Sequence, residues 1–136
     1  MEKFYSGGYL YNPKTQSVLL HLRDGNTKIN PHQWAFFGGA SEGDETPTET
    51  FIREMHEELG IHILPDEVKI LRDYVNDEFG THRYVFFMES ELPKEEMQLG
   101  EGADFDWIPL KKVLEYDITE KTRGDMEYFI SKFQIA

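Results

Sequence analysis

The sequence predicts an α/β (α+β) domain in which a mixed β-sheet is covered by helices. Three observations support this class. Short strand-like runs recur between turn sequences, two of these runs flank a hairpin turn, and helical segments interrupt and close the series. The 136 residues are enough for one domain with a substantial core and are few for two. Residues 1–136 are therefore expected to form a single domain.

Strands are expected where β-branched and aromatic residues run between turn sequences. The first run is rich in aromatic residues and stops at the turn sequence NPKTQ, and the sequence NDEFG separates two later runs as a hairpin turn would. The expected strands are Lys3–Tyr11, Ser17–Leu22, Val68–Val75, Arg83–Glu89 and Asp104–Pro109. A short buried run, Trp34–Phe37, is expected to stop at a Gly38-Gly39 turn.

The clearest helix signals lie between Thr46 and Gly60. Thr46 is a good N-cap, Pro47 suits the first helical position, and Glu49 completes a T-x-x-E capping box. Gly60 ends the helix where a left-handed residue is needed. The apolar stripe of this helix consists of Phe51, Ile52, Met55 and Leu59. A short helix at Leu110–Tyr116 and a longer one at Glu120–Phe133 are expected to close the domain.

Composition excludes several classes of function. The formal net charge is −12, which argues against binding a nucleic-acid polymer or an anionic membrane surface. The chain has no cysteine, so disulfides and thiolate sites are absent. No apolar run is long enough to span a membrane, and the first residues lack the pattern of a signal peptide. The absence of these segments predicts a cytoplasmic protein. Because the chain is acidic, a phosphorylated small ligand would need positive charge from metal ions.

Three glutamates of the helix, Glu54, Glu57 and Glu58, are expected to cluster on a face apart from the apolar stripe. A solvated helix face is the ordinary explanation of such a cluster. However, Arg53 is the only Lys or Arg between Pro47 and Gly60, so the carboxylates repel each other without many basic partners. Grouped carboxylate oxygens suit Mg²⁺ or Mn²⁺, which would turn this repulsion into attraction. The cluster therefore predicts a divalent-metal site.

The segment Gly39–Ile61 resembles the signature of the Nudix hydrolases, G-x5-E-x7-R-E-U-x-E-E-x-G-U, where U is a bulky apolar residue. The matching residues are Gly39, Glu45, Arg53, Glu54, Met55, Glu57, Glu58, Gly60 and Ile61. One departure is Phe37, where many members have proline before the glycine pair. The flanking sequences QWAFFGG and EGADFDWIPL also look like family strands. The resemblance implies the Nudix fold, a mixed β-sheet sandwiched between helices.

The resemblance also implies the metal site. Glu57 and Glu58 would be direct Mg²⁺ ligands, and Glu54 would be either a ligand or the base that takes a proton from the attacking water. The carbonyl of Gly38 would be a backbone ligand. Glu101 stands six residues before a tryptophan, as a further metal-approaching glutamate does in some members, although an ordinary loop acid is an equal alternative.

The other residues of the signature would support this site. Arg53 would orient the glutamates through charge-assisted hydrogen bonds. Glu45 would stabilise the junction between loop and helix, while Gly39 and Gly60 would serve the shape of the backbone. Outside the signature, Arg23, Phe36 and Arg83 are the candidates for binding the substrate. Aromatic residues that could stack on a base, although a core position is the commoner role, are Phe4, Tyr5, Phe36, Tyr74 and Phe79.

The implied reaction is attack by water on a nucleoside diphosphate linked to a further group, with Mg²⁺ or Mn²⁺ as the cofactor. The small size of the chain and its Glu101–Trp107 segment look more like the (d)NTP-cleaving branch of the family. The alternatives are a nucleotide sugar as substrate, or a Nudix-like domain that binds a nucleotide as a sensor without cleaving it. The complete set of glutamates favours catalysis. The expected partner is a small nucleotide, and a homodimer is expected only on the general ground that symmetric dimers are common.

Overall fold

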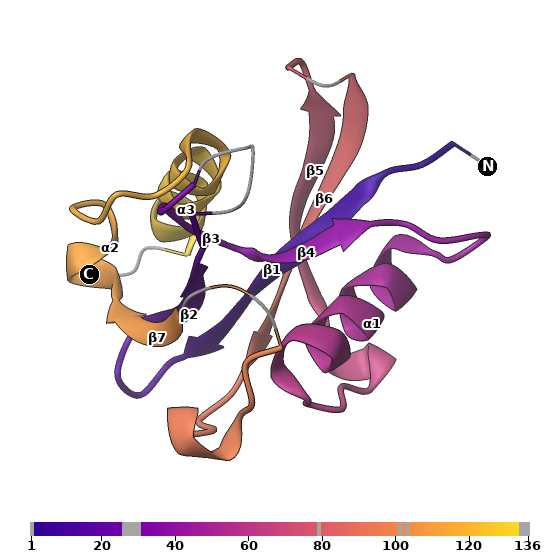
Figure 1. Ribbon diagram of the computed structural model, residues 1–136. Helices are drawn as coiled ribbons and strands as arrows, with labels where there is room; N and C mark the ends of the chain where they lie inside the picture. The colour runs from indigo at the N-terminus through magenta and orange to yellow at the C-terminus, as the bar shows by residue number, and fades with distance from the viewer. Residues whose placement is uncertain (1, 26–30, 79, 101, 103, 134–136) are drawn as a thin grey trace.

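The computed structural model describes residues 2–25, 31–78, 80–100, 102 and 104–133 of the chain (Figure 1). Its strands are β1 (Tyr5–Asn12), β2 (Ser17–Leu22), β3 (Trp34–Ala35), β4 (Phe37–Ala40), β5 (Lys69–Asn76), β6 (Thr81–Glu89) and β7 (Asp104–Pro109). Its helices are α1 (Pro47–Leu59), α2 (Leu110–Val113) and α3 (Glu120–Lys132), with short 3-10 turns η1 (Pro65–Glu67) and η2 (Lys94–Glu96). No helix in these ranges is both long and apolar enough to cross a membrane.

Strand β1 organises one mixed sheet. It runs parallel to β6 along one edge, from the Tyr5–Arg83 pair to the Tyr11–Glu89 pair. Its other edge is divided, because the first half pairs antiparallel with β4 and the second half with β2. Strand β2 also pairs with β7 and β3, whereas β5 pairs with β6 and ends the series. The division of β1 brings β4, the strand before α1, into the middle of the sheet.

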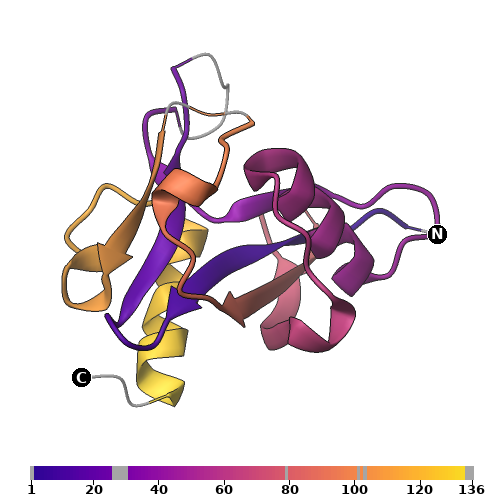
Figure 2. The same cartoon turned by 90° about the horizontal axis from the view of Figure 1, so that it is seen from below.

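Neighbouring residues of the central strands point to opposite faces of the sheet, as the twofold repeat of a strand requires. On β1, Tyr9 belongs to the core beneath α3, while Leu10 belongs to the core beneath α1. Phe36 and Phe37 divide in the same way between the two cores. The α1 side gathers Phe51, Met55 and Leu59, and the α3 side gathers Met126 and Phe129. A sheet between two helical layers results, as the sequence predicts (Figure 2).

The expected strands and helices are present, with bounds that differ by a few residues. The largest difference concerns Gly38 and Gly39, because the prediction that they form a turn is wrong. Both glycines lie inside β4, where Gly38 pairs with Gly7 and Gly39 with Ser6. Gly38 has a φ of 144°, and a Cβ there would lie only 2.4 Å from the Cα of Gly7. The two backbones can approach this closely because neither residue has a side chain.

The ends of α1 follow the predicted signals. The Thr46 side chain accepts a hydrogen bond from the Glu49 amide, and the Glu49 side chain accepts one from the Thr46 amide at 2.8 Å. Gly60 takes the left-handed conformation, with a φ of 71°, and its amide donates to the carbonyl of His56. The capping box and the terminal glycine therefore fix where α1 begins and ends.

Candidate active site

The site is built where α1 packs on β4. The backbone amide of Gly38 donates a hydrogen bond to Oε2 of Glu58 at 2.9 Å. One helical turn earlier, the carboxylate of Glu54 lies against Gly39, where a Cβ would be only 2.5 Å from Oε1. The two glycines thus serve different purposes: Gly38 supplies a donor, and Gly39 leaves room for a carboxylate.

Arg53 joins the carboxylates of α1 to the preceding loop. Its Nε donates to Oε2 of Glu45 at 2.7 Å, and its Nη2 donates to Oε1 of Glu45 and to the carbonyl of Ala40. Its Nη1 donates to Oε1 of Glu54 at 3.1 Å and to Oε2 of Glu57 at 3.3 Å. Arg53 therefore contacts two of the three clustered glutamates and holds them near the end of β4.

Glu45 is the fixed anion of this network. Besides Arg53, it accepts hydrogen bonds from the Thr50 hydroxyl and the Glu42 amide. The hydrogen bonds from Arg53 are the main reason that the pKa of Glu45 falls to about 2. The same contact raises the pKa of Arg53 further above its already high ordinary value. The loop before α1 and the helix are consequently joined by a permanently charged pair.

The three clustered glutamates differ in exposure, because only 12% of the Glu54 side chain is exposed and Glu58 turns inward. Glu57 is open, with 53% of its side chain exposed, whereas Glu58 is buried with 4% exposure. Glu58 turns inward against β4, where its Oε2 accepts the hydrogen bond of the Gly38 amide. Among the described residues, no three Asp, Glu, His or Cys side chains converge closely enough to ligate one ion. Glu101 lies outside the described residues.

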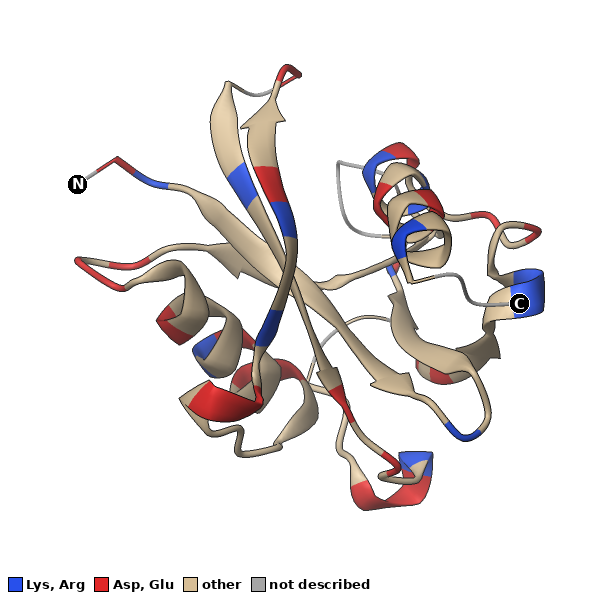
Figure 3. Ribbon diagram, turned by 180° about the vertical axis from the view of Figure 1, so that it is seen from behind, with Lys and Arg blue, Asp and Glu red and all other residues tan. Residues whose placement is uncertain are grey.

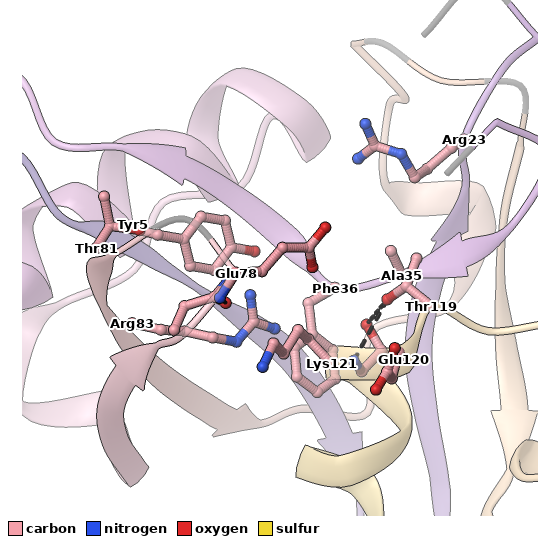
Figure 4. Close-up of a pocket in the computed structure, with 12 residues that line it drawn as sticks. Tyr5, Arg23, Ala35, Phe36, Glu78, Thr81, Arg83, Thr119, Glu120 and Lys121 are labelled. Atoms are coloured by element: carbon pink, nitrogen blue, oxygen red, sulfur yellow. Dashed lines mark hydrogen bonds between the residues drawn. The ribbon is translucent and has the colours of Figure 1, made fainter. Parts of the chain in front are cut away.

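A cavity of about 370 Å³ lies beside this junction, and we call it the Tyr5–Arg83 cavity (Figure 4). Its lining residues are Tyr5, Arg23, Ala35, Phe36, Asn76, Glu78, Thr81, Arg83, Thr119, Glu120, Lys121 and Thr122. It therefore combines two aromatic side chains with several charged and hydroxyl groups, which come mainly from β6, α3 and the ends of neighbouring strands. The combination suits a flat polar ring better than a purely apolar ligand.

Tyr5 connects the cavity to the glutamates. Its ring lines the cavity, while its hydroxyl lies over the opposed glycines of β1 and β4, such that a Cβ on Gly38 would be 2.9 Å from the oxygen. Burial raises the pKa of the Tyr5 hydroxyl, which is therefore a neutral donor at physiological pH. Gly38 of β4 therefore has Tyr5 of the cavity on one side and the carboxylate of Glu58 on the other.

The structure brings all three substrate-binding candidates to this cavity. Arg23, Phe36 and Arg83 lie on its wall, although Phe36 is also a core residue with a ring 5.0 Å from that of Tyr9. Of the other aromatic candidates, Tyr74 lines a separate groove beside α3, and Phe79 lies outside the described residues.

Sequence reasoning missed the residues that α3 contributes. Thr119, Lys121 and Thr122 line the cavity, and Asp125 lies fully buried behind Arg83. A signal for Asp125 was present, because it occupies the buried stripe of α3 beside Met126, where an apolar residue is expected. A charged residue at such a position indicates a paired partner on the sheet.

Charges are distributed unevenly around the site. Figure 3 shows acidic residues along α1 and the loop before it, whereas basic residues are interspersed on β5 and α3. The cavity carries both signs, since Arg23, Arg83 and Lys121 line it together with Glu78 and Glu120. An anionic ligand at the α1 end would need additional positive charge, since Arg53 is already bonded to carboxylates.

The fold and the site together define a class: a mixed sheet between helices, with an arginine-held glutamate cluster at the strand before the first helix. The model of the NUDIX domain family matches residues 4–131 of this chain. The chain therefore belongs to the Nudix family, and it is a Nudix-type hydrolase of phosphoanhydride bonds. Enzymes of this family generally use divalent metals.

Solved structures share the fold at low sequence identity. A mutT/nudix family protein from Listeria innocua superposes with a TM-score of 0.78 and 16% identity, over 98% of this chain and 94% of that one. The MutT protein from Methanosarcina mazei Go1 gives 0.77 and 21%, over 97% and 95% of the two chains. The NUDIX domain of Shewanella oneidensis NrtR, solved with ADP ribose, gives 0.74 and 16%, over 96% and 86%.

Proposed function

We propose that this protein is a Mg²⁺-dependent pyrophosphohydrolase that cleaves a nucleoside diphosphate linked to a further group, with a (d)NTP-type nucleotide as the favoured substrate. The observation that carries the proposal is that a group of carboxylates and a cavity lined by aromatic and charged side chains lie next to each other. The carboxylates that Arg53 holds on α1 pack against β4, and the Tyr5 side chain of the Tyr5–Arg83 cavity lies against Gly38 of the same strand. The first suits metal-bound phosphates and the second suits a nucleoside.

The donor set fits magnesium or manganese. The candidate ligands are the carboxylates of Glu54, Glu57 and Glu58 and the carbonyl of Gly38, all of them oxygen donors, with Glu101 as a further candidate. Glu57 is exposed and held by one hydrogen bond to Arg53, so its side chain is free to turn toward an ion. The metal, when bound, neutralises the phosphoanhydride and lowers the pKa of a water molecule.

The chain's own groups supply positioning and proton transfer. In our proposal Arg53 keeps the carboxylates oriented, and Glu45 keeps Arg53 in place through its paired hydrogen bonds. Glu54, packed on Gly39, is either a metal ligand or the base that accepts a proton from the attacking water. Gly60 ends the helix that carries these residues, and its role is one of backbone shape.

The Tyr5–Arg83 cavity would receive the nucleoside end of the substrate. Tyr5 and Phe36 offer ring surfaces, while the cations that line the cavity are Arg23, Arg83 and Lys121. A nucleotide sugar is the second candidate substrate. Binding without cleavage is the second candidate function, and the ADP ribose complex of the related Shewanella oneidensis domain gives it support.

The proposal is tested by Glu57→Gln, with Glu127→Gln, an exposed change on α3, as the matched control. Loss of one carboxylate ligand should lower turnover roughly a hundredfold or more at saturating Mg²⁺. The fold should be unaffected because Glu57 is exposed.

Turnover is followed by phosphorus NMR on a panel of nucleoside triphosphates and nucleotide sugars, which identifies both the products and the attacked phosphorus. Near-normal turnover of Glu57→Gln would refute the ligand assignment, and tight nucleotide binding without turnover by the unaltered protein would favour the sensor.

Three further proposals concern the whole protein. We infer that residues 1–136 act as one domain, that the protein works in the cytoplasm, and that it pairs as a homodimer. The family match over residues 4–131 supports the first. The second and third rest on the sequence arguments, and light scattering after size-exclusion chromatography tests the third.

A further inference from the structure

Asp125 of α3 is a fully buried carboxylate that two arginines share. Arg72 of β5 donates to Oδ1 through Nε and Nη2, at 3.1 and 2.9 Å. Arg83 of β6 donates to Oδ2 through the same two atoms, at 3.1 and 3.0 Å. The Tyr74 hydroxyl adds a fifth donor on Oδ1 at 2.9 Å. The carboxylate and both guanidinium groups are consequently fixed in orientation.

The two arginines have the same partner but face different places. Arg83 is 8% exposed and lines the Tyr5–Arg83 cavity, with its guanidinium 4.6 Å from the ring centre of Tyr5 and 5.8 Å from that of Phe36. Arg72 lines the separate groove beside α3 and lies over the ring of Tyr74 at 4.8 Å. Only one of the two can therefore contact a ligand in the cavity.

The bonds to Asp125 leave one nitrogen of Arg83 available. Nε and Nη2 are committed to Oδ2, and no hydrogen bond joins Nη1 to any residue that the structure describes. Figure 4 shows the guanidinium among the side chains that line the cavity, near Tyr5 and Lys121. A guanidinium has donors and no acceptor, so this wall of the cavity presents a fixed group that can only donate.

We propose that Arg83, held by Asp125, is a specificity-determining residue that selects nucleosides presenting an oxo group to the cavity over those presenting an amino group. An oxo oxygen accepts the hydrogen bond of Nη1, whereas an amino group places two donors face to face and leaves a buried cationic donor unpaired. Sites built around such a donor reject the wrong partner strongly, because the unpaired group has lost its water. The inference rests on the proposed function, in which this cavity receives the nucleoside.

Nucleoside monophosphates test it directly, because they have no phosphoanhydride to hydrolyse. Inosine and adenosine 5′-monophosphates form one pair that differs in an oxo or amino group, and uridine and cytidine 5′-monophosphates form another. Titration calorimetry of the unaltered protein should show roughly tenfold tighter binding of the oxo member in at least one pair, and of the amino member in neither. Equal affinities in both pairs, a preference for an amino member, or no binding of any of the four at millimolar concentration would each overturn the inference.

Two variants distinguish a direct contact between Arg83 and the ligand from an effect of Arg83 on the stability of the fold. Arg83→Gln replaces a donor-only group with an amide that both donates and accepts, so the preference should fall to about twofold or less. Arg72→Gln removes the same kind of contact from the same carboxylate but lies outside the cavity, so it should keep the preference. Equal loss of the preference in both variants would show that Asp125 and the two arginines affect binding only by stabilising the fold. It would refute the proposal that Arg83 selects the base by direct contact. If either variant is unstable, the measurement on the unaltered protein still decides the inference.

The two proposals fail in different ways. Hydrolysis that depends on Glu57, together with equal affinities for oxo and amino nucleotides, would refute the specificity of Arg83 and leave the hydrolase intact. A preference for oxo nucleotides without hydrolysis of any phosphoanhydride would leave Arg83 as a selector and refute the proposed reaction.

Discussion

At the scale of single residues, the sequence identified which residues belong to the site but did not show how deeply they are buried or what they bond to. The signature located Arg53 and the clustered glutamates, and the structure joins Arg53 to Glu54 and Glu57 by hydrogen bonds. It could not show that Glu58 turns inward, because helical spacing places residues on a face but does not reveal that the Gly38 amide of the neighbouring strand donates to Glu58. Asp125 escaped notice for a similar reason, since its partners lie more than forty residues away in the chain.

His21 shows how such an environment sets a measurable property. It is 7% exposed on β2, its Nε2 bonds to the carbonyl of Phe36 at 2.9 Å, and its Nδ1 has no hydrogen-bond partner among the described residues. Burial, the largest cause, lowers the pKa of His21 to about 4. The folded protein therefore binds this proton less readily than the unfolded chain, and stability that is present above pH 6.5 is lost as the pH falls toward 4.

We accordingly predict that the unfolding free energy decreases on the order of 2–3 kcal/mol through this imidazole between about pH 7 and pH 4. His21→Gln should lose this part of the pH dependence while being less stable at pH 7, because the ring stacked on Phe37 is removed. His62→Gln, at an exposed position, is the control. Urea unfolding at a series of pH values measures the effect, and parallel pH profiles for His21→Gln and the unaltered protein would contradict it.

At the scale of elements, α1 was the easiest to predict and β4 the hardest. Local signals at Thr46 and Gly60 fix both ends of the helix, and they operate within a few residues of the chain. Strand β4 carries two glycines that ordinarily mark a turn, and it is a strand only because the glycines of β1 allow the backbones to meet. Pairing with a distant partner therefore overrode the local preference for a turn at Gly38-Gly39.

The cap of α1 gives a prediction at this scale. Thr46→Ala should lower the unfolding free energy by about 1 kcal/mol, because the amide of Glu49 loses its acceptor at the start of the helix. Thr48→Ala, two positions along in the same helix, is the control and should have no such cost because alanine favours a helix. Equilibrium urea unfolding is the measurement, and Thr46→Ser should restore most of the lost stability. An equal effect of the two alanine substitutions would show that the cap contributes nothing.

At the scale of the whole molecule, charge is the dominant feature. The chain carries a formal net charge of −12, and much of the acidic surface lies on α1 and the loop before it (Figure 3). The fold class was predictable because strand-like runs recur between turn sequences and helical segments interrupt and close the series. In the structure, neighbouring residues of the central strands pack into two cores, one on each face of the sheet. The Tyr5–Arg83 cavity was not predictable, because its wall comes from several strands and from α3, which meet only in the complete sheet.

Divalent ions should therefore stabilise the molecule as a whole. Mg²⁺ at millimolar concentration is expected to raise the melting temperature, because it binds the folded glutamate cluster and relieves its repulsion. Sodium chloride at the same ionic strength should raise it less, and Glu57→Gln should reduce the response to Mg²⁺. Differential scanning fluorimetry follows all three comparisons. Identical responses to magnesium and sodium salts would show that the ions act by screening alone.

The sharing of Asp125 has a consequence for how this protein can evolve. A lineage that exchanges Arg83 first still keeps the carboxylate paired with Arg72 and Tyr74. A lineage that exchanges Asp125 first leaves two guanidinium groups without their common counter-ion beneath α3, and such a buried loss is severe. Mutational paths to a new base preference are thus ordered, with the arginine open to early change and the aspartate able to follow only after one of its cations has gone.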